Sequence, residues 1–229
     1  IPNPGGGVSD IMVYLSTGVQ LPLVVEEGVT FVGNYDLLSE PYIASTPNYG
    51  PYTVTTSPTG LLIKSNRRGI VGAISAGVLE DQAYMFFMLP GSTIRNVRLE
   101  GAMPGYQDYN FDRKLCGGVK ILGENIEPST YVNQIKNCEI YNFSYAGVFV
   151  EAGCDEVQIS NCQIHHIKGE GGGTTAKGYG TWIKGKDDTQ VGSIVNLNQN
   201  IFDDCKTAID LDSDFTHLTV ENGSFGRIF

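Results

Sequence analysis

The sequence has few basic residues and no apolar run of membrane-spanning length. It contains 15 Lys and Arg against 25 Asp and Glu, a formal net charge of −10. A surface of this charge repels nucleic-acid backbones and anionic membranes, so nucleic acid is not an expected partner. The apolar residues, 41% of the chain, are never contiguous over the roughly 20 positions that a membrane-crossing helix needs. We therefore expect a soluble protein without a membrane span.

The five cysteines contain no C-x-x-C pair and are scattered between Cys116 and Cys205. This spacing indicates neither a zinc site nor a disulfide framework, and an odd count leaves at least one thiol outside any intramolecular pair. The first four residues include no Met and no apolar signal segment. We expect a processed mature protein or a fragment of a longer one. Glycosylation sequons at Asn142 and Asn222 favour a secreted, extracellular or cell-surface location.

A repeated phrase dominates the second half of the chain. Its pattern, apolar-x-Asn-x-x-apolar, occurs at residues 94–99, 135–140 and 159–164, and more loosely at 197–202 and 220–225. The shorter intervals, from Asn137 to Asn161 and from Gln199 to Asn222, fit one bare coil of a solenoid, and the longer intervals carry insertions. Because Asn tolerates a left-handed backbone, we expect the Asn column to form a tight bend and to hydrogen-bond between coils.

A second phrase, a small residue followed by apolar-x-apolar, lies between copies of the first at residues 118–121, 147–150, 180–183 and 208–211. This alternation is typical of a short strand with one buried face. Stacked coils would bury the inward residues together, which predicts an all-β, right-handed parallel β-helix. We expect one domain over residues 1–229, with irregular coils and a cap in 1–84 and regular coils in 85–229. The expected core residues on these strands are Val119, Ile121, Val148, Val150, Ile183, Ile209 and Leu211.

With these phrases, the chain resembles the pectin-lyase-like superfamily of secreted right-handed β-helix proteins, in which "I-x-N-C-x-I" is followed by "G-I/V-x-V". The resemblance covers about residues 85–229 and implies polysaccharide as the ligand class. It implies no particular activity, since this architecture carries lyases, glycosidases and non-catalytic shafts. Of the four motifs of the pectinolytic glycosidases, only Asp-Asp pairs occur, at 187–188 and 203–204. Neither pair lies on the strands expected to form a groove.

Strand alternation directs a set of polar and aromatic side chains outward. We expect one exposed column for substrate binding, made of Lys120, Phe149, Trp182 and Asp210, and beside it Leu122 with three candidate catalytic residues, Glu151, Lys184 and Asp212. Exposed aromatic rings beside mixed charge would stack on sugar rings. The chain has a single Trp, and it lies in this column.

These residues leave two reactions open. Glu151 and Asp212 would lie two coils apart, with backbones separated by roughly 9–10 Å, near the ~6.5–9.5 Å of inverting glycosidases. A lyase would instead need a base such as Lys184, but neighbouring acids disfavour its neutral form. No firm cofactor or metal site is expected. The one metal that the sequence suggests is calcium, with Asp210, Asp212 and Asp214, which share one face of a strand, as its oxygen ligands.

Two further features bear on function. His165 and His166 close a strand of another sheet, and alternation places one ring inward or in a turn and the other outward, in a structural or solvated role. The segment 225–229 stops just after a strand with no visible cap. The alternative function is therefore a non-catalytic structural, adhesive or assembly module that associates with itself through this end.

Overall fold

The computed structural model describes residues 12–15, 23–33, 62–65, 84–101, 117–123, 131–143, 145–167, 178–184, 193–212 and 216–228, with backbone alone in 12–15 and 62–65. Within these ranges the protein is all-β, and every strand pair is parallel. No helix in the described part of the chain is long and apolar enough to span a membrane.

The strands form three parallel sheets. In chain order, sheet 1 contains β1 (Met12–Leu15), β4 (Leu62–Ser65), β7 (Arg98–Glu100), β10 (Glu139–Tyr141), β13 (Gln163–Ile167), β16 (Ile201–Cys205) and β19 (Ser224–Phe225). Sheet 2 contains β2 (Leu23–Val25), β5 (Tyr84–Met88), β8 (Gly117–Ile121), β11 (Ala146–Val150), β14 (Tyr179–Lys184) and β17 (Thr207–Asp212). Sheet 3 contains β3 (Thr30–Val32), β6 (Thr93–Arg95), β9 (Val132–Lys136), β12 (Glu156–Ser160), β15 (Ile194–Asn198) and β18 (His217–Glu221).

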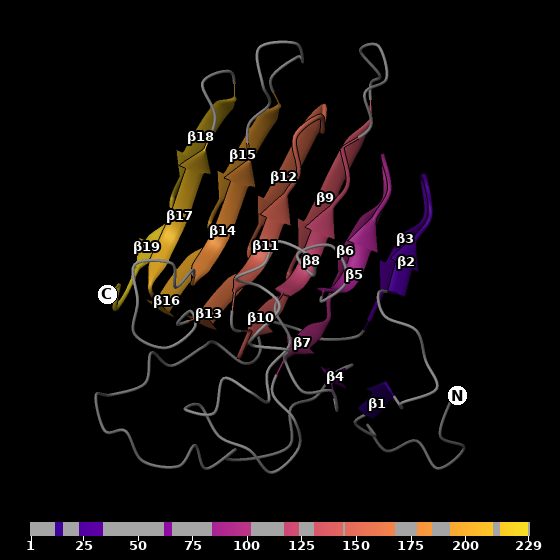
Figure 1. The fold of residues 1–229 in the computed structure, drawn as a ribbon, viewed down its shortest axis with the longest axis horizontal. Helices are drawn as coiled ribbons and strands as arrows, with labels where there is room; N and C mark the ends of the chain where they lie inside the picture. Colours follow the sequence, from indigo (N-terminus) through magenta and orange to yellow (C-terminus); the bar gives the residue numbers. More distant parts are fainter. Residues whose placement is uncertain are drawn as a thin grey trace, which may run out of the picture.

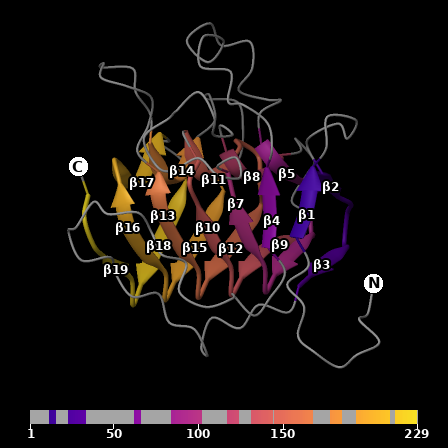
Figure 2. The same cartoon turned by 90° about the horizontal axis from the view of Figure 1, so that it is seen from below.

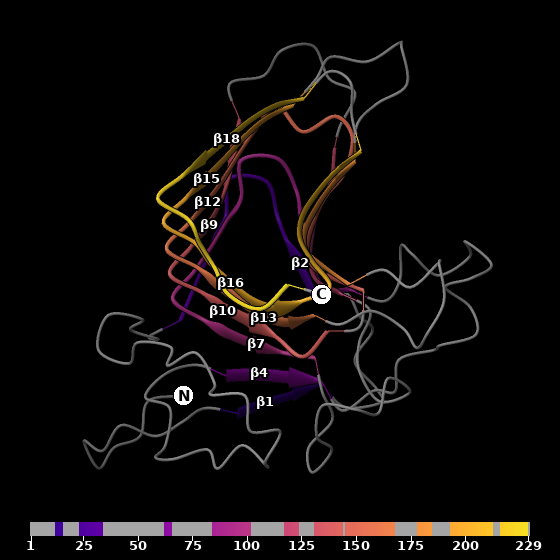
Figure 3. The ribbon, with the colours of Figure 1, turned by 90° about the vertical axis from the view of Figure 1, so that its left-hand side faces the viewer.

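Consecutive strands belong to different sheets, so each circuit of the chain adds one strand to every sheet. The chain passes from β9 in sheet 3 to β10 in sheet 1 and β11 in sheet 2, and β12, β13 and β14 repeat this order (Figure 1). Figure 2 shows the strands of sheet 1 side by side in chain order, from β1 to β19. Seen along the stack, the three sheets surround a common interior (Figure 3). None of the three sheets closes on itself within the residues that the structure describes.

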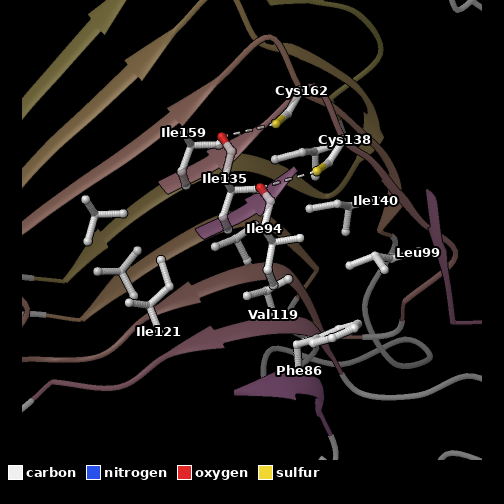
Figure 4. Packing of buried hydrophobic residues seen from close by; sticks show 14 of the residues in the cluster. Phe86, Ile94, Leu99, Val119, Ile121, Ile135, Cys138, Ile140, Ile159 and Cys162 are labelled. Carbon is white, nitrogen blue, oxygen red and sulfur yellow. Dashed lines mark hydrogen bonds between the residues drawn. The ribbon is translucent and has the colours of Figure 1, made fainter. Parts of the chain in front are cut away.

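One hydrophobic cluster fills this interior with side chains from all three sheets. Figure 4 shows it between Ile135 and Ile159 of sheet 3, Ile140 of sheet 1 and Val119 of sheet 2. Of the seven predicted core residues, five are fully buried, namely Val119, Ile121, Val148, Val150 and Ile183. Ile209 is half-buried and packs against the cluster.

The prediction for Leu211 was wrong, because this side chain is 42% exposed. It lies on β17, which within the described part of the chain has a neighbour in sheet 2 on one side alone. Its register partner Ile183 is buried, because β14 has a neighbouring strand on each side. Burial on these strands therefore depends on a circuit stacked on each side and not on the alternating pattern alone.

The expected Asn column is confirmed. Asn96, Asn137, Asn161 and Asn222 all have a left-handed backbone, with φ between 51° and 57°, at the bend from sheet 3 to sheet 1. Gln199 occupies the same position in its circuit with φ 55°. The cysteines that follow two of these bends, Cys138 and Cys162, are buried free thiols. Each donates an Sγ–H bond to a backbone carbonyl of the neighbouring circuit (Figure 4).

The irregular coils and cap expected over residues 1–84 are described in part, at residues 12–15, 23–33 and 62–65 and at residue 84. Strand β1 pairs with β4, β2 pairs with β5, and β3 pairs with β6. The rest of the range 1–84 lies outside the described residues, and the single domain over 1–229 stays a prediction.

Candidate functional site

The outer face of sheet 2 carries the side chains predicted to bind a ligand, and their register is as expected. The column runs through Phe87, Lys120, Phe149, Trp182 and Asp210 as successive register partners. Lys184 and Asp212 are also partners on β14 and β17. Glu151 follows β11, and its amide donates to the Ile121 carbonyl. Alternation therefore predicted correctly which side chains leave the interior together.

The expectation that this column is an exposed platform was wrong. Trp182 is 3% exposed, Phe149 is 4% exposed and Lys120 is 2% exposed. The Phe149 and Trp182 rings stack with centroids 4.3 Å apart, and Tyr145 meets Trp182 edge-on at 5.5 Å. Packing of large aromatic faces on one another removes them from water. These rings therefore form a second buried cluster, on the outer face of sheet 2. The two rings predicted to stack on a sugar, Phe149 and Trp182, are therefore covered.

Lys120 is a buried cation held by the same cluster. Its ammonium lies 5.7 Å from the Phe87 ring centroid and 5.3 Å from that of Phe149. It also pairs with Glu151 at 3.0 Å. Glu151 accepts a second bond from the Gly123 amide at 3.3 Å, so its carboxylate is fixed from two sides. The Lys120 ammonium is therefore engaged in contacts within the protein, and its role is structural.

The residues that remain open to solvent form a charged rim, defined as Glu151, Lys184 and Asp212. Lys184 and Asp212 are exposed, and the Glu151 side chain is 34% exposed. The Lys184 ammonium lies 5.7 Å from the centroid of the Trp182 ring. The rim thus borders the buried aromatic cluster, with a positive charge between two negative ones.

The acids at the end of sheet 2 affect a neighbouring phenol. The pKa of Tyr179 is raised, first by burial and then by the charge and hydrogen bond of Asp210 and the charge of Asp212. Among the described residues, no three His, Cys, Asp or Glu side chains are grouped as a metal site would require. Asp214, the third member of the suggested calcium set, lies outside those residues.

A second polar cluster, on the outer face of sheet 1, was not predicted. Register partners there form two columns, Arg98, Glu139 and Gln163 in the first and Glu100, Tyr141, His165 and Asp203 in the second. Glu139, His165 and Asp203 are each less than 10% exposed. Charged groups are buried only when paired, so the contacts among them decide what the cluster does.

The strongest contacts form a continuous chain across four strands, which we call the His chain. Arg98 donates from Nε to Glu139 Oε2, and Glu139 Oε1 lies 3.0 Å from His165 Nε2. His165 Nδ1 lies 2.5 Å from His166 Nδ1, and His166 Nε2 lies 3.3 Å from Asp204 Oδ2. His166 and Asp204 are 2% and 1% exposed. The two imidazoles are therefore held between two carboxylates.

Burial by itself would raise the pKa of Glu139, but the hydrogen bonds and charges of His165 and Arg98 outweigh it and lower this pKa. The Tyr141 phenol stacks on His165 with ring centroids 5.0 Å apart and donates to Glu100 at 3.2 Å. Burial raises the pKa of Tyr141 well above its ordinary range, and the charges of Glu100 and Glu139 raise it further. The cluster thus contains an ionised carboxylate beside a neutral phenol.

The expectation of one ring inward or in a turn and the other outward holds in part, because His166 has the left-handed backbone of a bend, but neither ring is solvated, since His165 is 5% exposed and His166 is 2% exposed. His166 has φ 57°, like Asn142 and Asp204 at the same place in the neighbouring circuits. A left-handed residue interrupts strand alternation, so both rings enter one buried region. A signal was present in the sequence, because Glu100, Tyr141, His165 and Asp203 each follow a bend residue by the same offset.

Comparison of the chain with protein-family models, with curated proteins and with solved structures found no match.

Proposed function

We propose that this chain is an extracellular polysaccharide-binding protein, built as a right-handed parallel β-helix of the pectin-lyase-like kind. Three parallel sheets visited in a fixed order support the fold, since parallel crossovers are right-handed in about 98% of cases. The ligand binds along the charged rim of sheet 2. The ligand class, polysaccharide, is inferred from the "I-x-N-C-x-I" phrase and the resemblance to pectin-lyase-like proteins that it carries.

The observation that carries the site is the register of the rim. Glu151, Lys184 and Asp212 belong to neighbouring circuits and are open to solvent, while the residues beneath them are buried and tightly packed. A rigid floor under exposed charged groups favours binding because few rotamers of the floor are lost when a ligand arrives. Lys184 would contact a carboxylate or a hydroxyl of the sugar, and the two acids would accept from hydroxyl groups.

The rim also offers a hydrolytic reaction. Glu151 and Asp212 are separated by two strand spacings, or roughly 9–10 Å between backbones. This is close to the ~6.5–9.5 Å that an inverting glycosidase needs for an acid and a water-activating base. In such a reaction one carboxyl protonates the leaving oxygen, and the other takes a proton from the attacking water. Lys184 would then position the substrate and take no part in proton transfer.

Binding is tested by titrating the protein with a panel of uronate-containing and neutral oligosaccharides. Trp182 is the sole tryptophan and lies beside Lys184, so its fluorescence should report a ligand at the rim. Lys184→Ala should weaken binding at least tenfold with unchanged melting, since the side chain is exposed. Lys136→Ala, on β9 of sheet 3, is the matched control and should bind as the wild type does. Product release in the same panel, abolished by Glu151→Gln, would extend the function to catalysis.

No fluorescence change and no calorimetric heat across the panel would reject the proposal. Equal binding by wild type and Lys184→Ala would reject the rim as the site while leaving the ligand class intact.

A second candidate function is self-assembly, and the surface at the last circuit favours it. Four large apolar side chains there are between 41% and 51% exposed, namely Leu211, Val220, Phe225 and Ile228. Among the described strands, β17, β18 and β19 each have one neighbour in their sheets, so their outer edges can pair with a further parallel strand. A second copy of the chain could bury this apolar surface.

Sedimentation at increasing protein concentration tests this function. Assembly through the last circuit predicts a concentration-dependent mass that Phe225→Lys reduces and Val24→Lys, an exposed position on β2, leaves unchanged. A monomer at all concentrations would reject it.

A further inference from the structure

We propose that Asn222 is a site of spontaneous covalent modification, where the side-chain amide leaves as ammonia and aspartate or isoaspartate takes its place. The sequence contains a single Asn-Gly pair, Asn222-Gly223, and it forms the bend between β18 and β19. The proposal is independent of any ligand at sheet 2.

The reaction joins the side chain of Asn222 to the next backbone nitrogen. The Gly223 nitrogen loses its proton to solvent and attacks Cγ of Asn222. The N–Cγ bond forms and the Cγ–Nδ2 bond breaks, and Nδ2 leaves as ammonia after taking up a proton. The product is a cyclic succinimide, in which the nitrogen is bonded to both carbonyl carbons of residue 222.

Water then opens this ring. Cleavage at Cγ restores the peptide bond with an aspartate side chain, whereas cleavage at the main-chain carbonyl carbon leaves isoaspartate, with the chain continuing through Cγ. The net reaction consumes one water and releases one ammonia, and no atom is oxidised or reduced. Either product carries a new carboxylate, one of whose oxygens comes from water.

Glycine at position 223 favours the attack because it has no side chain to obstruct the approach of Cγ. The bends at the equivalent positions have the same left-handed backbone, at Asn96, Asn137 and Asn161. The residues that follow them have side chains and are fully buried, namely Val97, Cys138 and Cys162. Position 222 therefore combines the shared bend with an unobstructed nitrogen.

The bend at Gly223 is also open to solvent. All residues from 220 to 226 are exposed. Among the described residues, the Gly223 amide donates no hydrogen bond, whereas the Cys162 amide donates to Oδ1 of Asn200 at 2.9 Å. Loss of the Gly223 proton therefore breaks no contact within the described part of the chain.

The Asn222 side chain is held weakly. Its amide donates to Oδ1 of Asn198 across 3.4 Å at an exposed site, beyond the usual range of about 2.7–3.2 Å. The corresponding bond from Asn137 to Asn96 is 3.2 Å long and partly buried. Solvent-exposed backbone with few buried contacts opens at low free energy. We therefore expect Cγ of Asn222 to reach the Gly223 nitrogen without global unfolding.

The test compares the folded protein with the protein unfolded in denaturant, both kept at pH 8 in water enriched in oxygen-18. Digestion in ordinary water and mass spectrometry then show where the heavy oxygen entered, and modification during digestion carries no label. We expect label at residue 222 of the folded protein, at a rate within about tenfold of the unfolded rate, because opening of this bend requires little free energy. A slower folded rate would overturn the proposal, since the bend would then protect the amide.

The bends at Asn96, Asn137 and Asn161 are internal controls in the same sample and should remain unlabelled in the folded protein. Equal labelling at all four bends would overturn the proposal, because the glycine would then make no difference.

Gly223→Ala is the matched variant. Gly223 does not have a left-handed backbone, and a Cβ there would lie no closer than 3.3 Å to the exposed ring of Phe225, so we expect the melting temperature of the wild type. The methyl group obstructs the attack, and labelling at residue 222 should fall at least tenfold in the folded protein and in the unfolded chain alike. The measurement on the unfolded chain does not require the variant to fold. Unchanged labelling would overturn attack by the Gly223 nitrogen.

The products supply a test that needs no variant. Ring opening at both carbonyl carbons should yield isoaspartate as well as aspartate at residue 222, and fragmentation spectra distinguish the two. Aspartate alone would overturn the proposal, since direct hydrolysis of the side-chain amide gives no isoaspartate.

Discussion

The side-chain amide of Asn137 donates a hydrogen bond of 3.2 Å to Oδ1 of Asn96, one circuit earlier in the stack. Both residues also have a left-handed backbone. The same residue type therefore meets two requirements, since Asn tolerates this conformation and its amide links neighbouring circuits.

Replacing Asn137 should separate these two contributions. Asn137→Ala loses the amide bond and also strains a backbone that costs an ordinary residue about 1–2 kcal/mol. Asn137→Gly loses the bond and relieves that strain, so it should be the less destabilised variant. Denaturant midpoints of the two variants measure the difference. Equal midpoints would mean that the bend imposes no backbone strain.

Gly147 should not accept a methyl group. A Cβ there would lie 2.7 Å from the Gly180 carbonyl oxygen and 2.7 Å from Cγ2 of Ile164 in the interior. Overpacking of this kind costs about 1–3 kcal/mol, so Gly147→Ala should lower the melting temperature. Gly223→Ala is the control because its nearest contact, at 3.3 Å, is the exposed ring of Phe225. An equal effect in both variants would contradict the tight packing at Gly147.

Trp182 should act through stability and not through direct ligand contact. Removing a buried aromatic side chain costs about 3–5 kcal/mol, and Trp182 is 3% exposed. Trp182→Ala should therefore unfold at much lower denaturant, while Trp182→Phe retains part of the packing on Phe149. Calorimetric unfolding of both variants checks this. A Trp182→Ala protein of wild-type stability would restore the open platform that the sequence predicted.

Cys205 should make the protein less stable at high pH. Burial raises the pKa of its thiol to about 12, above that of an unfolded cysteine near 8.5. Because the folded pKa is the higher one, the stabilising difference is complete below about pH 8.5 and is lost progressively as pH rises toward 12. Cys205→Ala should show a weaker loss of stability between pH 9 and 11. Thiol titration of the native wild type at pH 9 should leave Cys205 unmodified until denaturant is added.

Much of the fold could be predicted from the sequence by period alone. The Asn phrase located the bend between sheets 3 and 1, and the apolar-x-apolar phrase located the strands of sheet 2 and the residues that share an outward column. Both are local properties, since a left-handed bend depends on one residue and alternation depends on the strand itself. Leu211 shows the limit, because its burial depends on whether a further strand is stacked beside β17.

The candidate sites depended on tertiary structure. The sequence determined that Phe149 and Trp182 leave the interior together, but their burial arises from packing against each other and against Tyr145, which alternation does not specify. The sequence also determined that His165 and His166 adjoin at the end of a strand. That their rings meet between Glu139 and Asp204 was decided by the left-handed backbone at His166 and by the stacking of β13 between β10 and β16. Facing directions follow from local backbone geometry, whereas burial and partner choice follow from what the neighbouring circuits bring into contact.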